Sequence, residues 1–129
     1  MGLQDVDHFK QVSDRFSHAV GDRVLQRIGE LLRQHCRADD LCARHGGEAF
    51  ALLLLGADPA RAQASCERQR IAIAEHDWDT LAPGLRVTVS LGVAGLGMHA
   101  DVASSLAAAD ARLYTAKRLG RNRVVVSDA

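Results

Sequence analysis

The sequence predicts one α+β domain, a β-sheet with helices packed on it, and three observations lead to this fold class. Apolar residues recur every three or four positions in several segments and alternate or cluster in others, so helices and strands are mixed along the chain. Gly46 and Gly47 separate two short apolar runs, which is typical of a β-hairpin. The length of 129 residues suits a single domain over 1–129, with no internal linker or repeat.

The order of the elements follows from the same patterns. Asp58 and Pro59 combine a capping side chain with a proline in the first turn, which marks the start of a helix. Gly120 marks the end of another. We expect, in chain order, a strand before residue 8, helices over 8–17 and 24–32, strands over 41–44 and 50–55, a helix over 58–75, a strand over 85–93, a helix from 102 to about 119, and a strand over 123–126.

Charge and composition exclude several classes of function. The chain has 16 basic and 16 acidic residues, so a broad surface for nucleic acid or anionic membrane is not expected. No apolar run has the length of a membrane-spanning helix, and the N-terminus lacks the pattern of a signal peptide. Cys36, Cys42 and Cys66 do not have metal-ligand spacing, which favours free thiols in a reducing cytoplasm.

Polar residues gather where the hydrophobic pattern does not require them. Asp5 ends the first strand and Glu48 lies in the hairpin turn, so the two carboxylates can meet across neighbouring strands and hold a Mg²⁺ ion with substrate phosphates. Lys117 and Arg121 are four residues apart near a helix end and can hold one anion. Each also has an ordinary explanation, Glu48 as a solvated turn residue and the two cations as favourable charges at a helix C-terminus.

Taken together, these motifs resemble the GGDEF family of diguanylate cyclases. The resemblance runs along the chain in order through 5–10, 14–22, 44–50, 90–93, 109–117 and 120–123. It implies a nucleotidyl-cyclase-like fold with a ferredoxin-like core and a mostly antiparallel sheet. It also implies the joining of two GTP molecules into cyclic di-GMP by a homodimer with Mg²⁺ or Mn²⁺. Family members carry a further helix and most of the first strand before the first motif, so we expect this chain to be N-terminally truncated.

The resemblance assigns roles to matching residues around the metal and phosphates. Asp5, the carbonyl of Val6 and the carboxylate of Glu48 match metal ligands, and Glu48 is also the residue central to catalysis. Lys117 and Arg121 match the pair that holds the terminal phosphates. A divalent cation is therefore expected where a nucleoside triphosphate binds, and no other cofactor.

Further matches concern the nucleotide. Gly46 and Gly47 match glycines whose backbone approaches it closely, which a Cβ would prevent. Asp22 matches an aspartate that binds guanine, although its position before an apolar stripe is equally that of a helix N-cap. Phe9 and Lys10 match the wall and rim of the same pocket.

Two residues depart from the family pattern. Ala49 replaces a glutamate that contributes to the metal and 3′-hydroxyl chemistry. Removing an electrostatic group of this kind lowers the reaction rate by about 10²–10³-fold. Ser13 replaces an asparagine that reads guanine, and serine lacks the paired donor and acceptor of the amide. We therefore expect little or no turnover.

The family's product-binding motif, Arg-x-x-Asp, is present as Arg37 and Asp40, at the expected distance before Gly46. Arginine can form a forked pair with guanine or a phosphate, and aspartate can accept hydrogen bonds from the base. The second arginine of this site is expected to be Arg68, with Arg70 in reserve. The ordinary alternative is a surface ion pair between Arg37 and Asp40.

The sequence thus supports three hypotheses. The first is a degenerate, cytoplasmic GGDEF domain that binds cyclic di-GMP, singly or as a stacked pair, as a receptor or regulatory module, either at the Arg-x-x-Asp motif or at the altered active half-site. The second is a cyclase with residual activity on GTP. The third is an interaction module of a larger sensor that binds neither nucleotide. None involves nucleic acid or membrane insertion by this segment.

Overall fold

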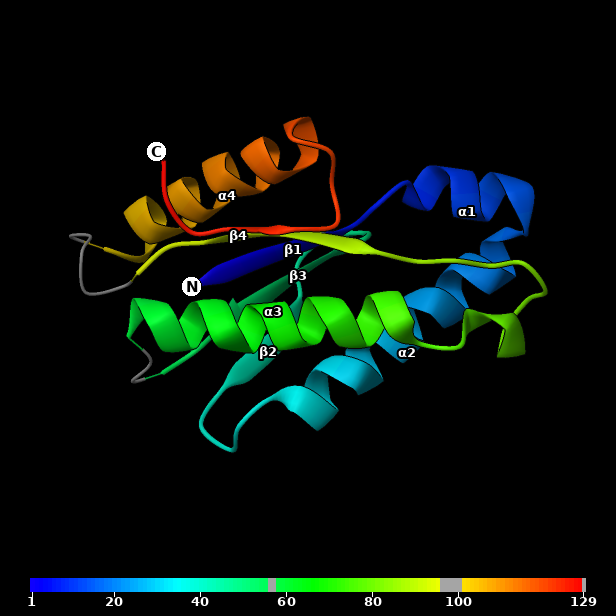
Figure 1. Ribbon diagram of the computed structural model, residues 1–129, viewed down its shortest axis with the longest axis horizontal. Helices are drawn as coiled ribbons and strands as arrows, with labels where there is room; N and C mark the ends of the chain where they lie inside the picture. Colours follow the sequence, from blue (N-terminus) through cyan, green and yellow to red (C-terminus); the bar gives the residue numbers. More distant parts are fainter. Residues whose placement is uncertain (56–57, 96–100, 129) are drawn as a thin grey trace.

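The computed structural model describes residues 1–55, 58–95 and 101–128 and shows a central sheet between helices (Figure 1). The strands in these ranges are β1 (Gly2–Val6), β2 (Leu41–Arg44), β3 (Ala49–Leu53), β4 (Val89–Val93) and β5 (Val124–Val125). The helices are α1 (Phe9–Arg15), α2 (His18–His35), α3 (Pro59–Glu75), α4 (Val102–Arg118) and a short 3₁₀ turn, η1 (Trp78–Thr80). The α+β class and the order of its elements are confirmed.

The sheet has the strand order β2-β3-β1-β4-β5. The pairings β2–β3, β1–β3 and β1–β4 are antiparallel, and only β4–β5 is parallel, because α4 crosses over between these two strands. The expected mostly antiparallel sheet is therefore present. The register places Asp5 of the central strand β1 between Ala49 of β3 and Ser90 of β4.

Helices cover the two faces of the sheet (Figure 1). The larger apolar cluster unites α2 and α3 with one face, and Ile28, Leu52 and Ile73 are fully buried in it. A smaller cluster, which includes Leu3 and Leu113, joins α4 to the other face. This second layer is close-fitting: a Cβ on Gly92 would lie 2.1 Å from the carbonyl oxygen of Ala109, so α4 rests directly on the backbone of β4.

Two expectations about element bounds were wrong. The alternating segment 85–93 forms a strand only over β4, since β1 ends at Val6, which pairs with Val89, and residues 85–88 have no neighbouring strand. Helix α2 starts at His18 rather than near residue 24, and the Ser17 hydroxyl caps it by accepting a hydrogen bond from Val20 N at 3.1 Å. Asp22 therefore lies inside the helix, and its interpretation as an N-cap was wrong.

Other predicted signals are confirmed. The Asp58 carboxylate caps α3 by accepting from Arg61 N at 2.9 Å, with Pro59 in the first turn. The Gly-Gly segment connects β2 to β3 as a hairpin. The β1–α1 loop, this hairpin and the C-terminal end of α4 meet at one end of the sheet, which is where most of the predicted polar residues lie (Figure 1). Among the described residues, no helix has the length and apolar character needed to cross a membrane.

Candidate functional site

The centre of the site is an ion pair between β1 and α4. The ammonium group of Lys117, in the last turn of α4, donates a hydrogen bond to Oδ2 of Asp5. The other oxygen, Oδ1, is buried and has no hydrogen-bond partner among the described residues. A buried carboxylate oxygen without a partner is costly, so it is available to a ligand that brings positive charge.

The hairpin brings the backbone of Glu48 next to the end of β1. The amide of Val6 donates to the carbonyl oxygen of Glu48 at 3.2 Å, and the Glu48 side chain is exposed. The turn before it is closed by Arg44, whose guanidinium donates to the carbonyl oxygen of Gly47 through Nη2 at 2.6 Å and Nε at 3.1 Å. Gly46 adopts a φ of 89°, which favours glycine. Arg44 is thus a structural partner of the signature turn that sequence reasoning did not single out.

The donor set fits a hard divalent cation. Asp5 Oδ1 and the Val6 backbone belong to β1, the Glu48 carboxylate belongs to the turn just before β3, and Mg²⁺ and Mn²⁺ prefer oxygen ligands. No group of three or more His, Cys, Asp or Glu side chains suited to a metal occurs in the described part of the chain. The protein alone therefore offers two carboxylates, and a cation here would need oxygens from a nucleotide and water to complete its shell.

Ala49 lies directly opposite Asp5 in the β1–β3 ladder. Paired residues of neighbouring antiparallel strands point to the same face, with Cβ atoms about 4.5–5.5 Å apart. A glutamate at position 49 would therefore share the face on which Asp5 meets Lys117. The carboxylate that Ala49 lacks, relative to the family pattern, is therefore one that would lie beside Asp5.

Arg121 follows α4 in a turn with unusual backbone geometry. Gly120, Arg121 and Asn122 have φ values of 124°, 64° and 47°. The Arg121 amide donates to the carbonyl of Ala116 at 2.9 Å, which ties the turn back to the helix. Among the described residues, the Arg121 guanidinium has no hydrogen-bond or ion-pair partner, so it is available to a ligand, and Lys117 lies four residues before it in the last turn of α4.

The residues matched to guanine binding lie between α1 and α2. A Cβ on Gly21 would be 2.7 Å from Oγ of Ser13 and 3.1 Å from Cζ of Phe9, so both side chains pack tightly on α2 next to Asp22. Ser13 is buried, whereas Asp22 and Lys10 are exposed.

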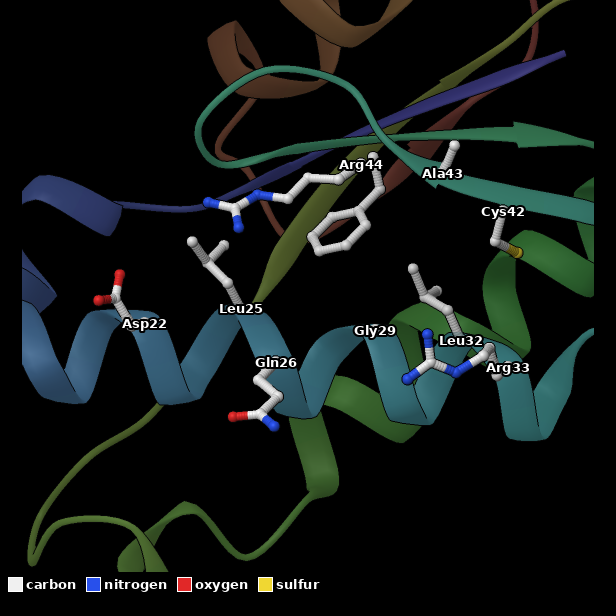
Figure 2. Close-up of a pocket in the computed structure, with 10 residues that line it drawn as sticks. Asp22, Leu25, Gln26, Gly29, Leu32, Arg33, Cys42, Ala43 and Arg44 are labelled. Carbon is white, nitrogen blue, oxygen red and sulfur yellow. The ribbon is translucent and has the colours of Figure 1, made fainter.

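Asp22 also lines a groove of about 320 Å³ between α2 and the β2–β3 hairpin (Figure 2). Arg44 and the buried ring of Phe50 belong to the same groove, and Arg33 and Cys42 line its far end. Burial, and then a hydrogen bond with the Cys36 thiol, raise the pKa of Cys42 to about 12. The Cys42 thiol is therefore neutral at neutral pH and lines the groove as a small apolar side chain.

The residues predicted to form a product site are located away from this end of the sheet. Arg37 and Asp40 form a turn in which Arg37 N donates to Asp40 Oδ2 at 3.0 Å and Asp40 N donates to the Arg37 carbonyl at 3.0 Å. The carboxylate thus fixes the backbone of the turn, and no ion pair between the two side chains occurs in the structure. The alternative of a surface ion pair between these two side chains was therefore wrong.

A small cleft of about 10 Å³ joins this turn to α3, and its walls include Arg37, Asp40, Leu55, Arg61 and Ser65. Sequence reasoning missed Arg61. Arg61 lies two residues after Pro59, in the first turn of α3, and this position could have indicated that it is close to the turn at 37–40.

Arg68, the expected second arginine, reaches the edge of this cleft. Its Nη2 donates to Oγ of Ser65 at 3.3 Å. The reserve choice, Arg70, is directed elsewhere: it pairs with Glu67 and donates to Oδ1 of Asn122 at 2.8 Å. The hydrogen bond from Glu67 raises the pKa of Arg70. Of the two arginines, Arg68 is therefore the one placed near Arg37 and Asp40.

Comparison with known proteins gives consistent results. The chain matches the family described as diguanylate cyclase, GGDEF domain, over residues 2–123. It is 40% identical over 129 residues to the probable diguanylate cyclase DgcT of Escherichia coli, which covers 98% of this chain and 28% of that protein. It spans about a third of the length of diguanylate cyclase A of Treponema denticola.

Solved structures agree. The active GGEEF domain of a diguanylate cyclase from Vibrio cholerae has a TM-score of 0.90 at 32% identity, covering 99% of this chain and 81% of that one. The GGDEF domain of DgcB from Caulobacter crescentus, in complex with c-di-GMP, has a TM-score of 0.89 at 29% identity, covering 99% and 77%. With the fold, the register of the signature hairpin and these matches together, the chain belongs to the diguanylate cyclase GGDEF domain family.

Proposed function

We propose that this domain binds cyclic di-GMP in the cleft between the turn at 37–40 and α3, and that it acts as a receptor or regulatory module in the cytoplasm rather than as an efficient cyclase. The observation that carries the proposal is the charge of this cleft. Arg37, Arg61 and Arg68 come from two separate elements, and among the described residues none of the three forms an ion pair. A surface that gathers three guanidinium groups around one carboxylate, that of Asp40, has an excess of positive charge and favours an anionic ligand.

The chemistry of the cleft suits a guanine dinucleotide in particular. A guanidinium can donate two parallel hydrogen bonds to O6 and N7 of guanine or to a phosphate. Oδ1 of Asp40 has no partner in the turn, since Oδ2 accepts the bond from Arg37 N, so it can accept from guanine N1–H and N2–H. Leu54 and Leu55 supply apolar surface for a base, and the side chain of Leu55 is 50% exposed. The cleft is shallow, so the ligand would lie across it, as one molecule or as a stacked pair.

The altered catalytic end supports the receptor role. Ala49 removes a carboxylate beside Asp5, and Ser13 fills the buried position between α1 and α2 with a short hydroxyl side chain. Both changes weaken groups that would act on GTP, whereas Arg37 and Asp40 retain the residues expected of a product site.

Calorimetric titration with cyclic di-GMP tests the proposal. We expect saturable binding that Arg37→Ala weakens by about 1–3 kcal/mol, the value of one forked contact. Arg33→Ala is the matched control, because Arg33 is a cationic residue of α2 that lines the other groove. Absence of binding by the unaltered chain contradicts the proposal, and so does equal weakening by Arg33→Ala. Binding that resists Arg37→Ala but is lost on Asp22→Ala or Lys117→Ala moves the ligand to the active half-site.

A second candidate function is binding of GTP with Mg²⁺ or Mn²⁺, with residual synthesis of cyclic di-GMP by a homodimer. Two observations on the described residues favour it: Oδ1 of Asp5 is buried without a partner, and the guanidinium of Arg121, four residues after Lys117, also has none. Incubation with GTP and Mn²⁺, followed by chromatography, tests it. Product that disappears in Glu48→Ala supports this function, and no product from the unaltered chain at high enzyme concentration contradicts it. If the domain binds neither GTP nor cyclic di-GMP, the result favours the third hypothesis, an interaction module.

A further inference from the structure

The turn that carries Arg121 has a backbone that its sequence does not favour. Three consecutive residues, 120–122, have positive φ values, and two of them are not glycine. A left-handed conformation brings Cβ close to a carbonyl oxygen, so an L-residue with a side chain adopts it at a cost in free energy. Contacts from outside the turn must therefore hold Arg121 and Asn122 in place.

The first of these contacts comes from Asp7, just after β1. Oδ2 of Asp7 accepts hydrogen bonds from the amide of Asn122 at 3.0 Å and from Oγ1 of Thr88 at 2.7 Å. Oδ1 accepts from Oγ of Ser90 at 2.6 Å. The residue is only 6% exposed, and both of its oxygens are occupied within the protein. Asp7 is therefore unsuited to bind a metal or substrate, although its sequence position beside Asp5 and Val6 would permit it.

The second contact comes from α3. Nη1 of Arg70 donates to the side-chain Oδ1 of Asn122 at 2.8 Å. Nε of the same guanidinium donates to Oε1 of Glu67 at 2.9 Å, which fixes its orientation on the helix. Asn122 is thus held twice, through its backbone by Asp7 and through its side chain by Arg70.

The consequence concerns the residue before it. Two hydrogen bonds fix the backbone around Arg121: its own amide donates to the carbonyl of Ala116, and the amide of the next residue, Asn122, donates to Asp7. The guanidinium of Arg121 has no partner among the described residues. Arg121 follows directly after α4, whose last turn carries Lys117, and a guanidinium on a fixed backbone can bind phosphate at a lower cost in ordering.

We propose that Asp7 and Arg70 are positioning residues for Arg121, and that they act through Asn122 to direct its guanidinium at the terminal phosphates of a nucleoside triphosphate. The inference rests on the second candidate function, phosphate binding by Lys117 and Arg121, and goes beyond it by naming residues that never touch the ligand. It is independent of cyclic di-GMP binding at Arg37.

Comparison of GTP with GMP isolates this role, because only GTP has the terminal phosphates. Affinities of both nucleotides are measured by calorimetry with Mg²⁺. We expect the unaltered chain to prefer GTP by about tenfold or more, the effect of charge-assisted hydrogen bonds. Arg121→Ala should remove most of this preference. Asp7→Ala and Arg70→Gln should each reduce the GTP affinity several-fold while the GMP affinity stays unchanged.

Further variants separate positioning from general loss of structure. Asp7→Asn keeps an acceptor for the Asn122 amide, so it should restore most of the GTP preference lost in Asp7→Ala. Adding Asp7→Ala to Arg121→Ala should cost no additional GTP affinity, since there is no guanidinium left to position. Arg27→Gln is the matched control for Arg70→Gln, because Arg27 also pairs with a glutamate three residues away, Glu30, but lies on α2.

Three results would overturn the proposal. One is a wild-type chain without a preference for GTP over GMP, which would show that Arg121 holds no terminal phosphate. Another is equal loss of GTP and GMP affinity in Asp7→Ala and Arg70→Gln, which indicates damage to the fold. The third is an unchanged GTP preference in both variants. A failed titration with cyclic di-GMP, by contrast, would contradict only the receptor function, so the two failures are distinguishable.

Discussion

Replacing Ala49 with glutamate should raise synthesis of cyclic di-GMP from GTP by about 10²–10³-fold. The structure places position 49 opposite Asp5, on the face where Asp5 meets Lys117. A carboxylate about 5 Å from a cation bound there would gain about 3 kcal/mol per unit of cation charge at an effective dielectric constant of about 20. Since each 1.36 kcal/mol is about a tenfold change in rate, this corresponds to roughly 10²-fold for a single charge contact.

The assay is chromatographic detection of product after incubation with GTP and Mg²⁺ or Mn²⁺, at a protein concentration high enough to populate a dimer. Ala49→Gln is the matched control, because its side chain has the shape of glutamate without the charge. Ala49→Glu combined with Ser13→Asn should exceed Ala49→Glu alone, since an amide can both donate to and accept from guanine. Equal activity of Ala49→Gln and Ala49→Glu, or no gain in either, would refute the electrostatic explanation of the degenerate signature.

Three other predictions concern packing, pH and metal. Gly92→Ala should lower the free energy of unfolding by about 3 kcal/mol in urea titrations, because its Cβ would lie 2.1 Å from a backbone oxygen of α4; a change near zero would show that α4 can shift freely. Burial, and then the charge of Arg27, lower the pKa of His76 below its ordinary value of 6.5. The unfolded chain therefore binds more protons, and the free energy of unfolding should fall as pH drops from about 6.5 through the folded pKa. His76→Gln should flatten this part of the pH profile, and an unchanged profile would contradict the assignment. Chelation of the metal with EDTA should abolish the binding of GTP measured by calorimetry and leave the binding of cyclic di-GMP intact, because guanidinium groups rather than a cation line the cleft at Arg37. Loss of both would show that the dinucleotide also binds through the metal.

Local patterns predicted most of the fold because each of its elements has its own signal. The stripe over α2, the Asp58 and Pro59 pair and the Gly-Gly hairpin all appear where the sequence indicates. Residues 85–88 alternate like a strand but lack one, because strand formation depends on a neighbour and β1 ends too early to provide it. Periodicity alone carries no information about that neighbour.

The site was predictable where residues match a motif and not where distant segments meet. Asp5 and Lys117 are 112 residues apart, and only the fold shows that they form an ion pair. The arginine beside Arg37 in the cleft, Arg61, depends on how α3 is rotated over the sheet. The support of Arg121 by Asp7 and Arg70 depends on a left-handed turn at two residues that are not glycine, which no local pattern predicts.

The most direct measurement is the location of bound cyclic di-GMP on the isotope-labelled domain by chemical-shift mapping. We predict that the backbone amides of residues 37–40 and of 61–68 on α3 shift on titration, together with Leu55, while those of Asp22, Glu48 and 117–121 do not. Shifts confined to the second group would assign the ligand to the active half-site, and no shifts at saturating ligand would contradict binding of cyclic di-GMP by this domain.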